Sequence, residues 1–213
     1  MNPLDAPDPP TRLDPLDAVD VAAYDGAPVV IVGNGPVGQT LALLLARWGV
    51  GSVVLDRRTR RDLVGSKAIC QQRDVLDVWD SVGVGRAVAE EGVTWERART
   101  FYREHELFCL RFPDRGRSAF PPFVNISQCR TEQLLDAQIA RTPLVDVRWD
   151  HTVTDVRDGA DGVVLEVAGP DGEQTLRAPY AVLCTGGHSE HLRRNLGIEF
   201  GGRSFDDHFL ICD

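Results

Sequence analysis

The sequence lacks the cysteine patterns that build disulfide-rich or zinc-binding folds. Its five cysteines are scattered, no two of them form a Cys-x-x-Cys pair, and their number is odd. Small secreted domains and zinc knuckles need paired or regularly spaced cysteines, so both classes are excluded. We therefore expect reduced structural thiols in a cytoplasmic protein. His188 and His191 have the spacing of a helical metal pair, but no cysteine or carboxylate motif accompanies them, and we expect no metal site.

The sequence also lacks an excess of positive charge and long apolar runs. Its 32 acidic residues outnumber 23 basic ones, which gives a formal net charge of −9. This charge repels a phosphate backbone, so a general nucleic-acid binder is excluded. No apolar stretch approaches the roughly 20 residues that span a membrane, and no signal-peptide pattern is present. We expect neither nucleic acid nor membrane as a partner.

Residues 1–27 combine proline with aspartate. So much proline and charge cannot bury enough apolar surface to order the backbone, which predicts a disordered acidic, proline-rich tail. The whole chain, at 213 residues and 43% hydrophobic content, is large enough for a packed core. We place the folded domain over residues 28–213.

The start of this domain has the order of a nucleotide-binding βαβ unit. Residues 29–32 and 52–56 are β-branched runs that predict buried parallel strands, and residues 39–48 predict a helix between them. A glycine-rich sequence over 33–38 joins the first strand to the helix. This order predicts an α/β, Rossmann-like fold with a parallel sheet.

Beyond this unit the sequence predicts both helices and strands. Residues 74–82 and 131–139 carry apolar side chains at helical spacing, with Thr131 as the N-cap of the second helix. Residues 97–124 alternate short apolar pieces with arginine, proline and glycine, which predicts an added β-rich segment. Further strands are predicted over 145–149, 152–157, 161–168, 175–177 and 180–184.

The glycine-rich sequence predicts a cradle for a diphosphate. Gly33 permits a tight turn, Gly35 lets a phosphate approach the backbone, and Gly38 lets the helix pack closely on the sheet. The helix begins at Pro36–Val37, where free N–H groups and the helix dipole favour negative charge. The alternative is a glycine turn without a ligand, which leaves the complete βαβ context unexplained.

Asp56 lies at the end of the second strand, 18 residues after Gly38. A carboxylate at this place accepts hydrogen bonds from ribose hydroxyl groups and repels a 2′-phosphate, which disfavours NADP at this site. The βαβ unit alone leaves FAD and NAD open.

Four segments carry a resemblance that decides between them. The first is the glycine motif with Asp56-Arg57, and the others lie over 65–79, 124–128 and 183–213. With these the chain resembles the FAD-dependent aromatic hydroxylases, which are the p-hydroxybenzoate hydroxylase-like (group A) flavoprotein monooxygenases. Within that family it is most similar to the 3-(3-hydroxyphenyl)propionate hydroxylase type. The resemblance covers residues 29–213.

The resemblance implies FAD as cofactor, NAD(P)H as reductant, and O2 and a small phenolic or other aromatic compound as substrates. It implies FAD contacts from Arg57, from Lys67 (where the family has arginine), from Gln128 and from Gly186. The flavin carries the chemistry, so no side chain of this chain is expected to be a catalytic acid or base.

The chain departs from the family at two places. Thr185 stands before Gly186 where the family has an aspartate that serves FAD and NAD(P)H binding. The family's later Gly-Asp motif is absent from the chain. We therefore expect residues 28–213 to be the FAD-binding domain in part, with 97–124 as the start of the substrate-facing β region, ending before the full substrate domain. A carboxyl-terminal completing segment or a homodimer is then an expected partner.

Two other functions stay open. A non-catalytic remnant that binds FAD or ADP without turnover accounts for Thr185, and an NAD-linked dehydrogenase accounts for the βαβ unit alone. Ser189 lies in Gly-Gly-His-Ser-Glu, which is not a nucleophile elbow, and we interpret it as a helix N-cap with Glu190 in the first turn. The arginine-rich run over 57–61 is interpreted as a solvated edge, with Arg57 over the adenine or near a phosphate as the alternative.

Overall fold

Four short strands pair into one parallel sheet. The computed structural model describes residues 28–62, 69–113, 119–203, 205–208 and 210. The sheet has the order β12-β1-β2-β8, and its strands are β1 (Val29–Val32), β2 (Ser52–Asp56), β8 (Val145–Trp149) and β12 (Ala181–Leu183). All three pairings are parallel, so the carboxyl ends of the strands lie at one edge. The predicted α/β fold with a parallel sheet is confirmed.

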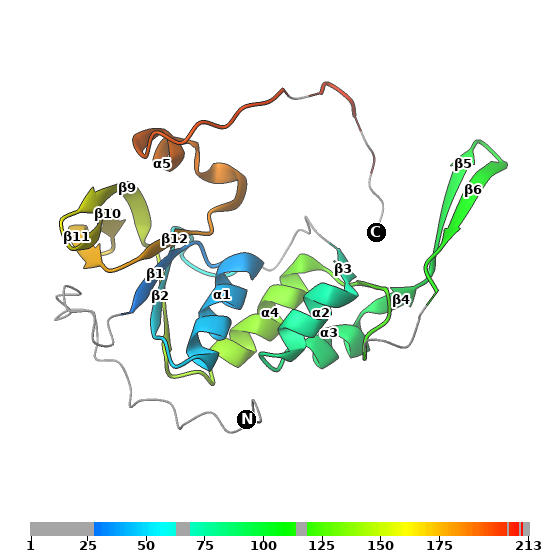
Figure 1. Ribbon diagram of the computed structural model, residues 1–213, viewed down its shortest axis with the longest axis horizontal. Helices are drawn as coiled ribbons and strands as arrows, with labels where there is room; N and C mark the ends of the chain where they lie inside the picture. The colour runs from blue at the N-terminus through cyan, green and yellow to red at the C-terminus, as the bar shows by residue number, and fades with distance from the viewer. Residues whose placement is uncertain (1–27, 63–68, 114–118, 204, 209, 211–213) are drawn as a thin grey trace.

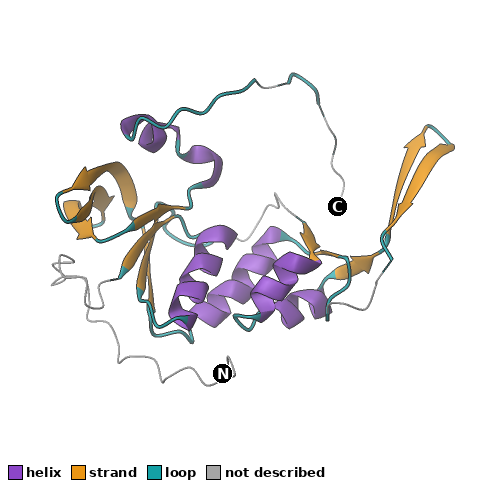
Figure 2. Ribbon diagram, viewed as in Figure 1, coloured by secondary structure: helices purple, strands orange, loops and turns teal. Residues whose placement is uncertain are grey.

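Helices cover one face of this sheet (Figures 1 and 2). Helix α1 (Pro36–Arg47) follows β1 directly, and its Ala42 packs with Ile31 and Val54. Helix α4 (Gln128–Ile139) lies beside α1. Helices α2 (Arg73–Asp80) and α3 (Gly85–Glu91) extend this layer away from the sheet around a second apolar cluster.

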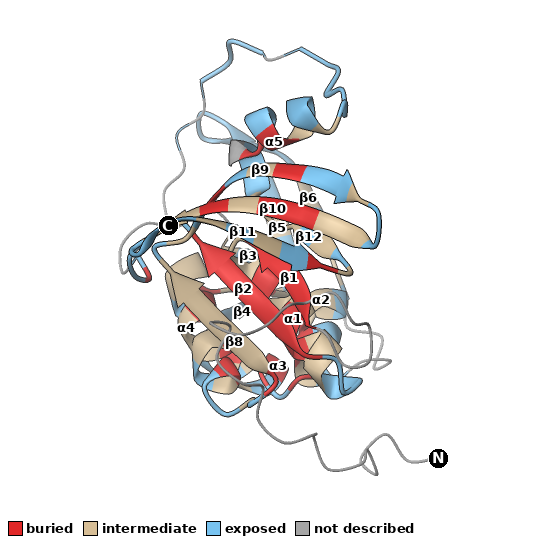
Figure 3. Ribbon diagram, turned by 90° about the vertical axis from the view of Figure 1, so that its left-hand side faces the viewer, coloured by how far each residue is buried: buried red, intermediate tan, exposed pale blue. Residues whose placement is uncertain are grey.

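An antiparallel meander covers the other face. It consists of β9 (Thr152–Gly159), β10 (Gly162–Gly169) and β11 (Gly172–Ala178). Apolar side chains of β9 and β10 pack with Val30 and Leu55 of the parallel sheet and with Leu192 of helix α5 (Glu190–Asn195). Figure 3 shows that β1 and β2 are buried along their length. Burial on both faces explains their continuous apolar sequences.

The remaining strands form two small antiparallel sheets. One has the order β3-β7-β4, with β3 (Cys70–Gln72), β7 (Phe123–Asn125) and β4 (Val93–Trp95). The other is a hairpin of β5 (Arg97–Tyr102) and β6 (His105–Arg111), which projects from the helical layer (Figure 1). Strands β5 and β6 and the start of β7 lie within the β-rich segment that the sequence predicts over residues 97–124, whereas β3 and β4 precede it.

One of the two predicted helix starts is wrong, and the other is right in position. Helix α4 begins at Gln128 and its N-cap is Ser127, whose hydroxyl oxygen accepts a hydrogen bond from the Arg130 N–H at 3.2 Å. Thr131 lies inside the first turn and is buried, with its hydroxyl group bonded to the Ser127 carbonyl. Ser189 is the N-cap residue of α5 and Glu190 lies in the first turn, as predicted, although the Ser189 side chain makes no cap hydrogen bond. Its hydroxyl oxygen instead accepts from Arg193 Nη1 at 2.6 Å.

Two predictions lie outside the described residues: the disordered tail over 1–27 and the place of Lys67. In the residues that are described, no helix has the length and apolar character needed to cross a membrane.

Candidate functional site

A cleft of about 860 Å³ opens at the carboxyl edge of the parallel sheet. In sheets of this kind ligands bind at this edge, where neighbouring strand connections run to opposite faces. The cleft brings together eight of the ten residues that the sequence predicts: Gly33, Gly35, Pro36, Val37, Asp56, Arg57, Gln128 and Gly186. Of the other two, Gly38 packs behind the cleft, and Lys67 is outside the described residues.

Close backbone contacts require glycine at both ends of the glycine loop. A Cβ on Gly38 would lie 2.0 Å from the Gly33 carbonyl oxygen. A Cβ on Gly33 would lie 2.5 Å from the Cys184 carbonyl oxygen, and Gly33 also has a φ of +109°. The loop is therefore pressed between the start of α1 and the end of β12.

Gly35 has a different role in the loop. Its backbone is extended, with φ −86° and ψ −177°, which any residue can adopt. A Cβ here would meet no protein atom within 4 Å, and the residue lines the cleft. The missing side chain therefore leaves open space over the backbone, as a bound diphosphate requires.

The start of α1 adds an electrostatic preference for an anion. Gly35 is the N-cap and has no side chain to bond the free N–H groups of the first turn. Pro36 occupies the first helical position, and no acidic residue lies in the first turn. The helix dipole and the free N–H groups together favour negative charge at this end of the cleft.

Asp56 is the acid at the end of β2, and its carboxylate is only 8% exposed. It accepts hydrogen bonds from the backbone N–H groups of Asn34 (2.8 Å) and Arg58 (2.9 Å). The Arg58 guanidinium donates to both carboxylate oxygens, at 3.0 and 2.9 Å. Burial raises the pKa of Asp56, but these hydrogen bonds outweigh it and hold the pKa below its usual value. The carboxylate is therefore charged at neutral pH.

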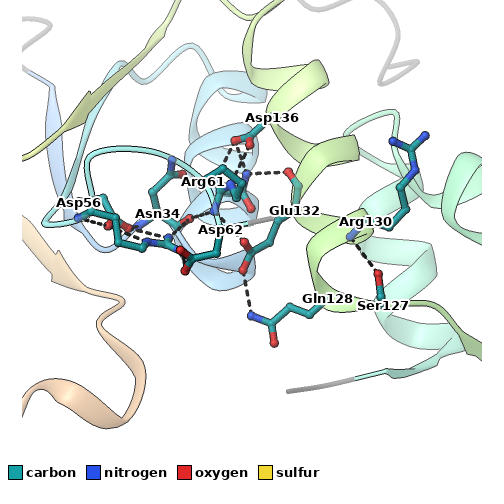
Figure 4. A network of polar contacts seen from close by, with 11 residues as sticks. Asn34, Asp56, Arg61, Asp62, Ser127, Gln128, Arg130, Glu132 and Asp136 are labelled. Carbon is teal, nitrogen blue, oxygen red and sulfur yellow. Dashed lines mark hydrogen bonds and ion pairs between the residues drawn. The ribbon is translucent and has the colours of Figure 1, made fainter. Parts of the chain in front are cut away.

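Arg61 is the centre of a polar network between the glycine loop and α4 (Figure 4). Its guanidinium donates to Asp136 through Nε (2.8 Å) and Nη2 (2.7 Å) and to Glu132 through Nη1 (2.9 Å). Nη1 also donates to the Asn34 carbonyl oxygen. The side chain is 8% exposed. The interpretation of residues 57–61 as a solvated edge is therefore wrong for Arg61.

Gln128 connects this network to the other side of the cleft. Its Nε2 donates to Glu132 Oε1 at 2.9 Å, one turn further along α4. The other oxygen of that carboxylate, Oε2, accepts from Arg61. The predicted flavin-contacting glutamine is thus linked through one buried acid to the arginine that holds the glycine loop.

Sequence reasoning missed four residues of the site: Arg58, Arg61, Glu132 and Asp136. The sequence does indicate such a network, since Glu132 and Asp136 are four residues apart on one helix and therefore lie on the same face. A basic run after the second strand offers the matching charge.

The residues match a family described as the FAD binding domain over positions 26–211. The chain belongs to this family. This match confirms the resemblance to FAD-dependent aromatic hydroxylases that the sequence motifs indicate.

Three proteins show the extent of the similarity. A 3-(3-hydroxy-phenyl)propionate/3-hydroxycinnamic acid hydroxylase of Mycolicibacterium smegmatis is 31% identical over 186 residues, covering 87% of this chain and 33% of the relative. A probable NADH-specific resorcinol 4-hydroxylase of Rhodococcus jostii is 29% identical over 192 residues, covering 87% of this chain and 35% of the relative. The anhydrotetracycline hydroxylase OxyS of Streptomyces rimosus has a solved structure with 30% identity and a TM-score of 0.69, covering 83% of this chain and 35% of that one. The chain thus spans about a third of the length of the curated relatives it matches.

Proposed function

We propose that this FAD binding domain holds FAD in the cleft as part of an NAD(P)H-dependent monooxygenase that hydroxylates a phenolic or other aromatic compound. The observation that carries the proposal is the open backbone at Gly35, placed between the start of α1 and the charged Asp56 in a chain of this family. A diphosphate with an adjoining ribose needs this combination.

Different residues of the cleft bind different parts of the cofactor. Gly33 and Gly38 keep the loop close to the sheet, Gly35 admits the pyrophosphate, and the N–H groups at Pro36–Val37 meet its charge. Asp56 takes the ribose hydroxyl groups, for which Arg58 must give up part of its contact with the carboxylate. Further contacts are proposed for Arg57, Lys67, Gln128 and Gly186, by the family resemblance.

Bound FAD would supply the redox chemistry, in which two electrons from NAD(P)H and one O2 put one oxygen atom on the aromatic ring and release the other as water. The cleft residues bind and orient the cofactor, and none of them is assigned a proton transfer. The names of the relatives support the substrate class, since each describes a hydroxylase, and one of them is described as NADH-specific. A cytoplasmic location is part of the same proposal, since the scattered cysteines of the sequence have no disulfide-framework pattern.

Thr185 favours a second candidate function. It lines the cleft at the place where the family has an aspartate, so one polar contact to the cofactor is weaker or lost. The second candidate is a domain that binds FAD or ADP and does not turn over.

Two measurements test these proposals. The chain is purified with added FAD and desalted, and its visible spectrum is recorded. Retained flavin bands near about 375 and 450 nm are expected, and their loss in Asp56→Ala, relative to the wild type, assigns them to this cleft. An absence of retained or titratable flavin in the wild type contradicts the monooxygenase proposal, and an absence of ADP binding as well contradicts the second candidate.

NADH and NADPH oxidation is then followed with a panel of phenols. Substrate-stimulated oxidation by the FAD-loaded chain excludes the non-catalytic candidate. Flavin binding without any turnover, when the same assay succeeds with a full-length relative as a positive control, favours it.

A further inference from the structure

Both ends of the Asn34 backbone are held by charged side chains outside the glycine loop. The Asn34 N–H donates to Asp56, and its carbonyl oxygen accepts from the guanidinium groups of Arg61 and Arg58, the latter at 3.2 Å. Asn34 itself is fully buried between Gly33 and Gly35. The loop conformation is therefore set by groups that surround the cleft, before any ligand contributes.

Of the two arginines, Arg61 is the more deeply buried, with its side chain 8% exposed against 28% for Arg58. A guanidinium is a planar fork with donors on fixed directions. In Arg61 the Nε and Nη2 sides bind Asp136 and the Nη1 side binds Glu132 and the loop carbonyl. Gln39 of α1 holds Asp136 from a second side, with Nε2 donating to Oδ1 at 2.7 Å. The arginine is thus fixed on α4 independently of the loop that it contacts.

A fixed carbonyl determines the direction of the next N–H group. The peptide between Asn34 and Gly35 is planar and trans, and no cis peptide occurs in the described residues. In such a unit the C=O and the N–H point to opposite sides. When Arg61 holds the Asn34 carbonyl, it therefore also fixes the N–H of Gly35, at the open position of the cleft.

We propose that Arg61 is a positioning residue for the pyrophosphate of the dinucleotide. It acts through the Asn34 carbonyl, and it uses Asp136 and Glu132 of α4 as its support. The inference rests on the proposed function, because it concerns the same cleft. It goes beyond the family motif, because none of the three side chains belongs to the glycine sequence or to the ribose acid.

The charge of Arg61 could attract a phosphate without any positioning, and Asp136→Asn separates the two effects. The substitution removes one negative charge, so simple electrostatics predicts tighter binding of an anion. It also places an amide NH2 opposite a guanidinium N–H, which breaks the two-point contact and loosens Arg61. Positioning therefore predicts weaker binding of an anion. Asp136 is 33% exposed and asparagine has nearly the same shape, so the change leaves no cavity in the core.

The probes are ADP and adenosine, which share the ribose and differ in the diphosphate. Their affinities are measured by titration calorimetry on the wild type, Asp136→Asn and Arg61→Lys, with a thermal melt for each. We expect about a tenfold loss of ADP affinity in both variants, and a change of less than about twofold for adenosine. Lysine keeps the charge of Arg61 but cannot reach both acids and the carbonyl together. Asp62→Asn is the matched control, since it removes the same charge from a 68% exposed acid that lines the cleft. Its ADP affinity should equal or exceed that of the wild type.

The possible results separate positioning from charge and from stability. An ADP affinity in Asp136→Asn equal to or above that of the wild type overturns the positioning role. Full ADP affinity in Arg61→Lys shows that the positive charge of residue 61, and not its geometry, determines ADP binding. Equal losses for ADP and adenosine, together with a lower melting temperature, show that the arginine only stabilises the fold. If one variant fails to fold, the ADP affinity of the other still distinguishes these cases. A wild type that binds neither ADP nor FAD refutes the proposed function itself, which is a different result.

Discussion

Alanine at two glycines of the same loop should separate folding from binding. Gly38→Ala places a Cβ 2.0 Å from the Gly33 carbonyl oxygen, whereas contacts below 3.0 Å essentially do not occur. Helix α1 and the loop must therefore move apart by about 1 Å, in a core where extra methyl groups cost about 1–3 kcal/mol. Gly35→Ala meets no protein atom within 4 Å.

The magnitudes follow from these contacts. For Gly38→Ala we expect a loss of about 3 kcal/mol, which in a domain of this size lowers the melting temperature by about 6–12 °C. At the N-cap, Gly35→Ala costs about 1 kcal/mol relative to glycine, and the stiffer unfolded chain offsets about 0.4–1 kcal/mol of it. Its melting temperature should stay within about 4 °C of the wild type. Its new methyl group stands in the open part of the cleft, so FAD affinity should fall at least about tenfold.

Thermal melts followed by circular dichroism and FAD titrations followed by flavin fluorescence measure the two quantities. The reasoning is refuted if Gly35→Ala unfolds as early as Gly38→Ala. It is also refuted if Gly35→Ala binds FAD like the wild type, because the diphosphate then does not approach this backbone.

Two further predictions concern the acid and the thiol of the cleft. The pKa of Asp56 is below its usual value of 3.8, so its hydrogen bonds stabilise the fold above that pH and are lost as the pH falls through the lowered pKa. Asp56→Asn should therefore be about 1.5–3 kcal/mol less stable than the wild type at pH 7, and urea unfolding should show this difference shrinking below about pH 4. Burial raises the pKa of the Cys184 thiol, which lines the cleft. Iodoacetamide should modify Cys184 slowly at pH 7 and faster above about pH 9, and FAD should protect it, as followed by peptide mass spectrometry.

A constant stability difference between Asp56→Asn and the wild type from pH 7 to pH 2 would show that the carboxylate charge does not matter to the fold. Equal modification of Cys184 with and without FAD would place the cofactor elsewhere.

The βαβ unit could be predicted from sequence because its information is local. The apolar runs of β1 and β2 are short and continuous, and Gly33 to Gly38 stand between strand and helix in unbroken order. Apolar periodicity and the steric need for glycine depend only on neighbouring residues, so the strands and the glycine turn can be predicted from the sequence alone. The strand ends then place the loop and Asp56 at the same edge of the sheet.

The arginine network could not be predicted in the same way. Arg61 and Asp136 are 75 positions apart, and only the packing of α4 beside α1 brings them together. A run of arginines is usually solvated, and nothing local distinguishes Arg61 from its neighbours.

Helix α3 could not be predicted for a similar reason. It begins at Gly85, and glycine is a poor helix former that the sequence alone would not place in a helix. The structure needs glycine here because a Cβ would lie 2.4 Å from the Leu76 carbonyl oxygen of α2.

The N-cap of helix α4 was predicted wrongly because two nearby residues can both cap a helix. Ser127 and Thr131 both have hydroxyl groups that can cap a helix, and the periodic apolar positions do not say which comes first. The structure places Thr131 in the interior, where its side chain is buried against the core.

The position of Trp149 has a practical consequence. Its ring lies 5.6 Å from the Arg58 guanidinium and 5.0 Å from that of Arg61, at the end of β8. Because the indole touches both arginines, any rearrangement of either alters its surroundings and therefore its fluorescence. Trp48, by contrast, is 83% exposed and reports only on bulk solvent. The chain thus contains an intrinsic emission signal for events at the glycine loop, which can be read in ordinary buffer without a label and assigned by comparison with Trp149→Phe.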